Sequence, residues 1–541
     1  MGKKIGNLGL LILLATVTSF CSNAYTQYAG VPSGERKILY ILLQIGIWTL
    51  VGFVAEVILA RYIRNREQLT GEPYELRFGM RKQIAGMVLC WLPYLLVFAP
   101  GLVNYDTVNQ LNDFFVGVSP VLFGFVEGQE TVVALLNDHH PVFVTLLFSL
   151  FLLLGKLVRC PGLGIFLYCL CQMIFGACIF VLFLNTLKKW GIGKRVYFGI
   201  YAFLSLSPFV GFYMATMLKN TLHAIIFVWY LWYYLRMING EYESRWKKGF
   251  LAVSLLLCLT QKTGIWLVLL CDVGLLLQRE QRRHRRAILL NAAVVFGVMF
   301  LLLPKVVFPI LQIYPGGKQE ILGTCFQQTA KVVYDGVEEV SEEERQVIDA
   351  VFDYDRITEL YDPHNTDNIK ATFRLHASTD DIRQYLGLWI RWGIRHPIKY
   401  LYATLNTCGG YFAPVETISV YEQIPSTDGV FAEIAPVMPT AVLECVTAIY
   451  TYLTQLSGVG IAFQAVVYTW WIPLLFLGGL IMQKRKRELA LCIPIGVNIL
   501  FLVVSPVYCA RYALPLVFAA PFLVGVLCGK ESNTQMTESM V

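Results

Sequence analysis

Charged residues are scarce in this sequence of 541 residues. Asp, Glu, Lys and Arg make up 15% of it, against about 25% in soluble domains, and apolar or aromatic residues (AVILMFWYC) make up 56%. Aqueous domains of this total length could not bury so many apolar side chains. The shortage of charge therefore excludes a soluble enzyme, a disordered chain and a disulfide-stapled secreted module, and it predicts a polytopic membrane protein.

The sequence also lacks several signals of other protein classes. Its 14 cysteines form no CxxC pair and no Cys/His spacing typical of a metal site, and most lie inside apolar runs, as buried free thiols do. No internal repeat or low-complexity tract is visible. The net charge is +7, but the basic residues gather in short links between apolar runs, which is typical of membrane topology rather than of a nucleic-acid surface. We expect no nucleic-acid partner.

Long apolar runs recur along the chain at the length that a membrane-spanning helix needs. The first run follows Lys3 and Lys4 and could be a signal peptide, but its long apolar core and the absence of a clear cleavage site favour a retained helix. Because a span takes about 20 apolar residues, we expect an all-α polytopic fold with about 11–13 transmembrane helices. The candidate runs are 5–24, 38–60, 83–100, 141–158, 162–187, 196–208, 220–238, 249–277, 287–304, 459–481, 488–504 and 512–528.

The placement of Lys and Arg predicts the orientation. Basic links such as 61–82 and 279–286 are expected in the cytoplasm, whereas 101–138 has no Lys or Arg and carries acidic residues. We therefore expect a multi-pass protein of the plasma membrane with cytoplasmic N- and C-termini. Segments 101–138 and 305–458 would then lie outside.

Three regions follow from this pattern. Residues 1–304 form a transmembrane domain with the external loop 101–138, and residues 459–541 form C-terminal transmembrane helices with a short cytoplasmic tail. Between them, 305–458 is predicted to be a mainly helical extracytoplasmic region. Within it, Ser341 to Glu344 form a capping box that opens a helix, and 385–405 mixes aromatic and basic residues as a helix on the membrane surface does.

Two stretches do not fit simple spanning helices. The runs 141–158 and 162–187 lie between a predicted external loop and a predicted internal link, so one of them should be half-length or re-entrant. The run 249–277 begins and ends at basic links and is interrupted at 261–263 by Gln-Lys-Thr. It predicts two half-helices that form a hairpin from the inside, because non-helical backbone at that depth must lie against protein or water.

The external loop 101–138 and its continuation hold the most informative polar residues. If 104–115 is a helix, Asp106 and Gln110 lie on one face, together with Asp113. The segment from Asp138 to Pro141 places a carboxylate and two imidazoles, His139 and His140, before the next run. Adjacent histidines converge poorly on one metal, so we predict no metal site here. The same residues could simply cap the helix that Pro141 begins.

Two cations lie at the predicted outer ends of distant spans. Lys219 stands at the start of 220–238, and Arg511 with Tyr512 stands at the start of 512–528. Each could be an ordinary interfacial residue that reaches toward water. Together with the external carboxylates they instead predict an acid-plus-cation site, in which the cations hold a lipid-linked phosphate and a carboxylate activates an acceptor hydroxyl.

Several motifs in this order resemble the GT-C superfamily of membrane glycosyltransferases, and most closely an uncharacterised bacterial family of polytopic proteins with a GT-C-like core. The motifs are PGLVNYDTVNQ (100–110), NDHHP (137–141), Pro208 followed by MLKN (217–220), 362–373, 396–403 and ARYALP (510–515). The resemblance implies transfer of a sugar from a polyprenyl-phosphate donor to a glycan or lipid acceptor of the cell envelope at the outer face of the membrane, sometimes with Mg²⁺ or Mn²⁺.

By motif position the resemblance places the catalytic acidic residue at Asp106. We rank Asp138 and His140 second as the base, and expect substrate contacts from five residues: Gln110, His139, Lys219, Arg511 and Tyr512. Two other functions stay open. A transporter or flippase of lipid-linked sugars would also use a broken helix such as 249–277, although no second half with a matching interruption is visible. A non-catalytic membrane scaffold would use 305–458 but would leave the acidic loop unexplained.

Overall fold

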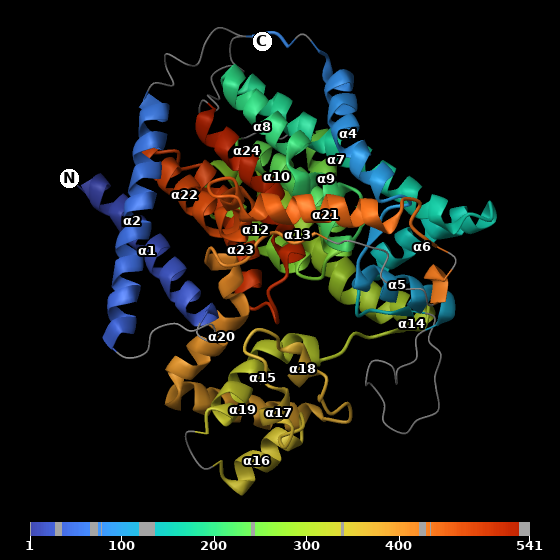
Figure 1. Ribbon diagram of the computed structural model, residues 1–541, viewed down its shortest axis with the longest axis vertical. Coiled ribbons are helices and arrows are strands. Elements are labelled where there is room, and N and C mark those ends of the chain that lie inside the picture. Colours follow the sequence, from blue (N-terminus) through green and yellow to red (C-terminus); the bar gives the residue numbers. More distant parts are fainter. Residues whose placement is uncertain are drawn as a thin grey trace.

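The protein is mostly helical, as predicted. The computed structural model describes residues 2–26, 35–64, 74–76, 78–117, 136–239, 244–336, 340–420, 429–432 and 434–529. In these residues the only strands are four of two residues each. Figure 1 shows a large body of packed helices and, below it, a smaller helical unit in yellow and light orange.

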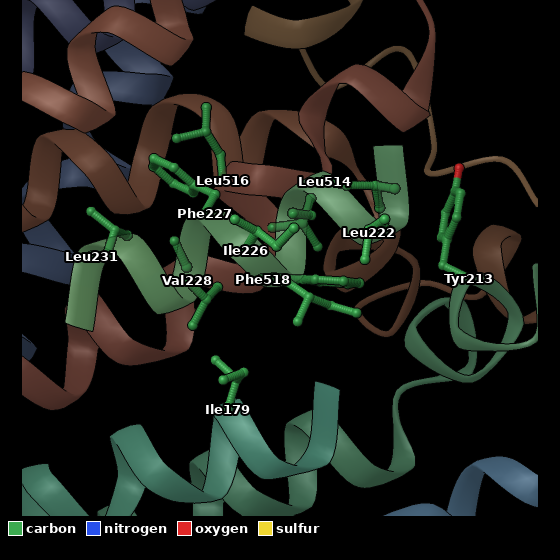
Figure 2. Close-up of a cluster of buried hydrophobic side chains, with 14 of the residues drawn as sticks. Ile179, Tyr213, Leu222, Ile226, Phe227, Val228, Leu231, Leu514, Leu516 and Phe518 are labelled. Carbon is green, nitrogen blue, oxygen red and sulfur yellow. The ribbon is translucent and has the colours of Figure 1, made fainter. Parts of the chain in front are cut away.

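The centre of the large body is built on α10 (Lys219–Ile238) and α24 (Ala510–Cys528), which are buried on nearly all faces. Figure 2 shows Ile226 and Phe227 of α10 facing Leu516 and Phe518 of α24. Close packing, rather than removal from water, stabilises such an interface in a bilayer. The surrounding helices include α4 (Met80–Val97), α7 (Pro161–Lys189), α8 (Lys194–Leu206) and α9 (Pro208–Met214).

The structure resolves the ambiguity between 141–158 and 162–187. Helix α6 (Val142–Leu157) has 16 residues and α7 has 29, so α7 extends for about 43 Å at 1.5 Å per residue. Both ends of α6 lie near the same end of α4: its N-terminus follows the Asp106 region, and Gly162 just beyond its C-terminus packs on Pro100. The short run is therefore α6, and α7 is the run long enough to span a membrane.

The interruption at 261–263 separates two helices, α11 (Ser244–Thr260) and α12 (Gly264–Leu277). They form the predicted hairpin and approach closely, because a Cβ on Gly264 would lie 2.5 Å from the carbonyl oxygen of Leu257. Helix α12 has the predicted bounds, and α11 begins five residues before the predicted start at 249. Their tip reaches the NDHHP segment, where Lys262 forms an ion pair with Asp138.

A second core lies in the smaller unit. It is built on buried residues between Leu322 and Tyr400, and it does not extend over the whole of 305–458, because later residues of that range, such as Tyr411 and Tyr450, pack in the main core. Its helices are α15 (Gln319–Tyr334), α16 (Glu342–Asp349), α17 (Ile357–Leu360), α18 (Asp367–Lys370) and α19 (Thr379–Arg395). The cap at Ser341 is present, since its side chain accepts a hydrogen bond from Glu344 N.

The single surface helix expected at 385–405 is wrong. The chain forms α19 and then α20 (Pro397–Phe412), with a break at His396, because a residue before proline avoids the helical conformation. Tyr385, Leu388 and Trp392 are buried in the second core. Helix α20 then joins the main body, where Gly409 packs against Tyr25 at the end of α1 (Gly2–Tyr25).

Four described helices are long and apolar enough to cross a membrane, namely Tyr40–Ile58 within α2 (Glu35–Arg64), Pro161–Lys189, Arg285–Ile310 and Ala510–Cys528. The bent pair α8 and α9, with 56° between its parts, passes the same test only when the two helices are taken together. The chain is thus a multi-pass membrane protein. Further apolar helices are shorter, so the number 11–13, like the orientation, stays a prediction. The remaining elements include α13 (Arg285–Phe296), η3 (Gly297–Val307), α14 (Phe308–Ile310), α21 (Thr440–Gln455), α22 (Ile472–Gln483) and α23 (Cys492–Val503).

Two short parallel strand pairs fix the loops at one end of the large body. Strand β1 (Leu102–Val103) pairs with β3 (Thr216–Met217), and β2 (Leu136–Asn137) pairs with β4 (Ile313–Tyr314). The first pair sets the start of α5 (Tyr105–Val116) beside the start of α10. The smaller unit contacts the same end, where Thr366 N donates to Pro506 O at 2.9 Å, shortly before α24 begins.

Candidate active site

Asp106 is held in place by the local structure at the start of α5. Asn104 caps the helix, and its side-chain oxygen accepts a hydrogen bond from Asp106 N at 2.8 Å. The next residue, Thr107, is fully buried and donates from its hydroxyl to Met217 O at 2.6 Å. The first turn of α5 is therefore fixed both to its own cap and to β3, which leads directly into α10.

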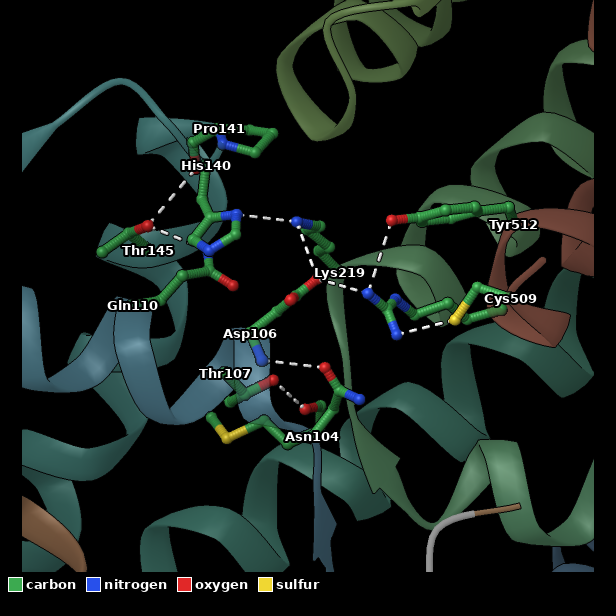
Figure 3. Close-up of polar contacts among 12 residues, drawn as sticks. Asn104, Asp106, Thr107, Gln110, His140, Pro141, Thr145, Lys219, Cys509 and Tyr512 are labelled. Atoms are coloured by element: carbon green, nitrogen blue, oxygen red, sulfur yellow. Dashed lines mark hydrogen bonds and ion pairs between the residues drawn. The ribbon is translucent and has the colours of Figure 1, made fainter. Parts of the chain in front are cut away.

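Two cations from distant parts of the chain meet at Asp106 (Figure 3). Lys219 Nζ lies 3.0 Å from Asp106 Oδ2, and Arg511 Nη2 lies 3.5 Å from the same oxygen. Lys219 is the first residue of α10, and Arg511 is in the first turn of α24. The structure thus brings together the three residues that the sequence placed at the outer ends of separate segments. Their side chains are 14–16% exposed, so water still reaches the group.

Positive charge gathers around Asp106. One carboxylate faces two cations, and each cation stands at the N-terminus of a helix, where the backbone dipole adds further positive charge. A cation at that end of a helix is unfavourable unless an anion is close. Two cations and two helix N-termini thus gather around the Asp106 carboxylate, an arrangement that favours negative charge and suits an anion.

His140 is the third partner of the centre. Its Nδ1 lies 2.7 Å from Lys219 Nζ, and since an ammonium group can only donate, Nδ1 accepts and the ring proton is on Nε2. The ring is buried, at 6% exposure, and Nε2 has no hydrogen-bond partner among the described residues. His140 therefore presents a buried N–H group that has no acceptor in the part of the chain that the structure describes. With its proton on Nε2 it acts as a donor, so it is a poor candidate for the base that we ranked second.

Burial and charge move the pKa values of this group in opposite directions. Burial raises the pKa of Asp106, but the charges of Lys219 and Arg511 outweigh it and hold that pKa well below its usual range. Burial, followed by the charge of Lys219, lowers the pKa of His140 well below its usual range. At neutral pH the centre thus contains an ionised carboxylate and a neutral imidazole.

Neighbouring residues hold the Arg511 guanidinium. Its Nη1 donates to Cys509 Sγ at 2.8 Å, and its Nη2 lies 3.4 Å from the hydroxyl of Tyr512. The guanidinium also lies over the Tyr512 ring, 4.9 Å from its centroid, which is a cation–π distance. Tyr512 therefore positions Arg511. From the sequence we had expected Tyr512 to contact the substrate.

Asp138 belongs to a second, separate charge pair. Lys262 Nζ lies 2.9 Å from Asp138 Oδ2 and also donates to the backbone oxygen of Asp138. Burial raises the pKa of Asp138, and Lys262 opposes this shift only in part. The two clusters are joined through the chain by His139, whose ring contacts that of His140 at 4.5 Å between centroids.

Gln110 and Asp113 do not orient Asp106, although all three are on α5. Gln110 Nε2 donates to Thr145 Oγ1 at 2.9 Å, so its hydrogen bond runs to α6. Asp113 accepts from Asn137 Nδ2 at 3.3 Å. Asp106 is held instead by Asn104 and the two cations.

Lys262 was missed as a site residue. In the sequence it appeared only as an interruption of an apolar run. A single cation in such a run could have indicated a site residue, since a charge within the membrane needs a partner. Its partner lies 124 residues away in the chain, and no local pattern connects the two.

The arrangement suits a divalent cation poorly. Among the described residues no three His, Cys, Asp or Glu side chains gather as a metal site. The two leading carboxylates are also covered by cations, Asp106 by Lys219 and Arg511, and Asp138 by Lys262. A metal ion would have to displace these ammonium and guanidinium groups, so we assign it no part in the chemistry.

Comparison with known proteins places the chain in a family. Residues 80–540 match the family described as "Family of unknown function (DUF6020)". The chain belongs to DUF6020. The matched range begins at α4 and contains both charge clusters, whereas α1 and α2 precede it. No curated protein gives a significant match to this DUF6020 chain.

One solved structure shares a distant likeness with this DUF6020 chain. It is the crystal structure of ArnT from Cupriavidus metallidurans bound to undecaprenyl phosphate, with 12% sequence identity and a TM-score of 0.31 over 82% of this chain and 77% of that chain. At this identity and TM-score the likeness is too weak to carry residue roles or activity from one protein to the other.

Proposed function

We propose that this protein is a membrane glycosyltransferase, which transfers a sugar from a polyprenyl-phosphate donor to a hydroxyl of a glycan or lipid acceptor in the cell envelope. The observation that carries the proposal is the Asp106 centre, where one carboxylate meets two cations at the N-termini of two helices. Excess positive charge suits the phosphate of a donor, and an adjacent carboxylate suits the activation of an acceptor.

The phosphate is assigned to Lys219 and Arg511. A guanidinium can bind two phosphate oxygens at once, and an ammonium group acts as a compact charge beside it. Both groups lie at the ends of apolar helices, so a phosphate that they hold would keep its polyprenyl chain within reach of the surrounding lipid. These cations would also stabilise the charge that appears on the phosphate as it leaves.

The reaction balances with Asp106 as general base. The acceptor O–H loses its proton to the carboxylate, and the acceptor oxygen forms a bond to the anomeric carbon of the sugar. The bond between that carbon and the phosphate oxygen breaks, and its electron pair leaves with the polyprenyl phosphate. Asp138 is the alternative base, and its pair with Lys262 would then be the reacting centre.

A transfer assay with purified protein tests the proposal. Sugar transfer from polyprenyl-phosphate donors would be measured for wild type, Asp106→Asn and Asp138→Asn, with thermal unfolding as a check of folding. We expect Asp106→Asn to lose at least about 10²-fold in turnover, as is typical of a missing general base. Wild-type turnover in Asp106→Asn together with an inactive Asp138→Asn would move the centre to the NDHHP segment.

The α11–α12 hairpin keeps a flippase as the second candidate. Its tip brings Lys262 from an apolar run to the same end of the molecule as the Asp106 centre, and broken helices are frequent in transporters. Vesicles that contain the protein and a lipid-linked sugar separate the two functions. Movement of the lipid across the bilayer with no transfer to any acceptor would favour the flippase.

A further inference from the structure

We infer that, before the donor binds, the Asp106 carboxylate occupies the anion position of this site, and that the donor phosphate must displace it from Lys219 and Arg511. Asp106 would then be both the internal competitor of the phosphate and the base that its arrival releases. The inference rests on the proposed function, because it assigns the two cations to the phosphate, and it adds an order of events that the function alone does not require.

The geometry of the ion pairs supports an exchange. Both cations contact the same carboxylate oxygen, Oδ2, so a phosphate that engages both of them needs the position that this oxygen holds. Of the two ion pairs, the one with Arg511 is the longer. One guanidinium nitrogen reaches the carboxylate at 3.5 Å, and Nη1 is turned to the sulfur of Cys509, which is a weak acceptor. A phosphate could satisfy the guanidinium better, through two oxygens.

His140 supplies an independent sign that an anion or other oxygen ligand belongs here. Its Nε2–H is buried and has no acceptor among the described residues, whereas buried polar groups are almost always hydrogen-bonded. Asp106 does not meet this need, because the imidazole faces Lys219 through Nδ1. A ligand with several oxygens, such as a phosphate beside a sugar, can serve the two cations and this donor together.

The exchange would couple donor binding to activation of the acceptor. While Asp106 is paired, the neighbouring cations keep its pKa well below its usual range, and such a carboxylate is a weak base. Once the phosphate neutralises these cations, the carboxylate loses their stabilisation and its basicity rises. The acceptor would therefore be activated only when the donor is in place, which protects the site from unproductive deprotonation.

Binding of undecaprenyl phosphate tests the inference separately from turnover. Its affinity for purified wild type and Asp106→Asn would be measured in detergent or nanodiscs, with Asp349→Asn as control, since that change removes a carboxylate from Arg374, 3.0 Å away in the smaller unit. If Asp106 competes with the phosphate, Asp106→Asn should bind at least about tenfold more tightly than wild type, and Asp349→Asn should bind like wild type.

Asp106→Asn removes the carboxylate that both cations contact, and this change could prevent folding. In that case a second pair of variants is compared. In Lys219→Gln, Arg511 still contacts Asp106 Oδ2, and the double variant Lys219→Gln/Asp106→Asn should still bind more tightly than Lys219→Gln. Equal or weaker binding after loss of the carboxylate, in either background, would overturn the exchange and leave the phosphate site in place. Absence of binding by every variant, wild type included, would overturn the proposed donor site itself.

Discussion

At the scale of single residues, the chemistry depends on side chains that are far apart in sequence and share one oxygen atom. Asp106, Lys219 and Arg511 come from three helices whose starts meet at one end of the molecule. Each residue alone is ordinary for a membrane interface. What distinguishes them is that two cations at helix N-termini contact the same carboxylate oxygen, and this gathering of positive charge is the physical basis of the proposed anion site.

The first residue-scale prediction concerns Arg511. Replacement by Lys keeps the charge but removes the planar fork and its contact with the Tyr512 ring, so donor phosphate should be held less well. We expect kcat/KM for transfer to fall by about tenfold, which corresponds to about 1.4 kcal/mol, with little change in thermal stability. Arg345→Lys, at an exposed ion pair with Asp355 in the smaller unit, is the matched control and should be without effect. Equal activity of both variants would contradict bidentate binding.

The second prediction concerns the pH dependence of stability. Burial raises the pKa of Asp113 to about 6, against a small opposing effect of its hydrogen bond from Asn137; the unfolded value is about 3.9. The folded state therefore holds this proton more tightly, and the resulting stability is fully present below about pH 4 and is lost as the pH rises through about 6.

Asp113→Asn removes this titration. Thermal unfolding of wild type and variant in detergent, between pH 4 and pH 7.5, should show wild type gaining relative to the variant as the pH falls through about 6. A difference that stays constant over this range would mean that Asp113 titrates as it does in the unfolded chain.

The sequence was sufficient to name the residues of the Asp106 centre, but it did not predict which side chains they contact. Charge scarcity made each polar residue near the end of an apolar run conspicuous, and the predicted topology placed Asp106, Lys219 and Arg511 on one side. Side-chain partners depend on packing between distant helices, so the hydrogen bond from Gln110 to Thr145 and the ion pair of Lys262 with Asp138 were not foreseen.

At the scale of elements, two hairpins shape the site. The start of α7, just after α6, packs on Pro100 through Gly162, and the pair α11 and α12 carries Lys262 to Asp138. The break at 261–263 could be predicted because polar residues interrupted an apolar run. The break at His396 could also have been predicted from Pro397, but the aromatic and basic pattern of 385–405 was given more weight than the proline.

A glycine substitution tests the α11–α12 hairpin. A methyl group on Gly264 would lie 2.5 Å from Leu257 O, so Gly264→Ala must push the helices apart and should cost about 1–3 kcal/mol. Gly199→Ala in α8 is the control, because nothing lies within 4 Å of the added methyl. We expect a lower unfolding temperature and weaker transfer only for Gly264→Ala, and unchanged stability would show that the close approach is not required.

At the scale of the whole molecule, a helical membrane body contacts a smaller helical unit with a core of its own. Composition and apolar periodicity were sufficient to predict the helical class and the positions of most helices. They did not predict where the smaller unit ends. The segments after Tyr400 resemble an external region in sequence, because they are more polar than a spanning helix, but their apolar residues pack in the main core.

Cysteine labelling tests the predicted orientation. In a background without reactive native thiols, Glu342→Cys in the smaller unit should react with a membrane-impermeant maleimide in intact cells. Arg282→Cys, in the basic link 279–286, should react only after permeabilisation. Both side chains are exposed, so access rather than burial decides the result. The reverse pattern would place the Asp106 centre on the cytoplasmic side.

The most direct measurement is the position of a bound donor phosphate. A cryo-EM structure of the protein with a non-transferable phosphonate analogue of a polyprenyl-phosphate sugar would show which side chains contact it. We predict phosphonate oxygens within hydrogen-bond distance of Lys219 and Arg511, an oxygen of the ligand at His140 Nε2, and the Asp106 carboxylate moved away from both cations. A phosphonate bound elsewhere, with the Asp106 ion pairs intact, would contradict the account.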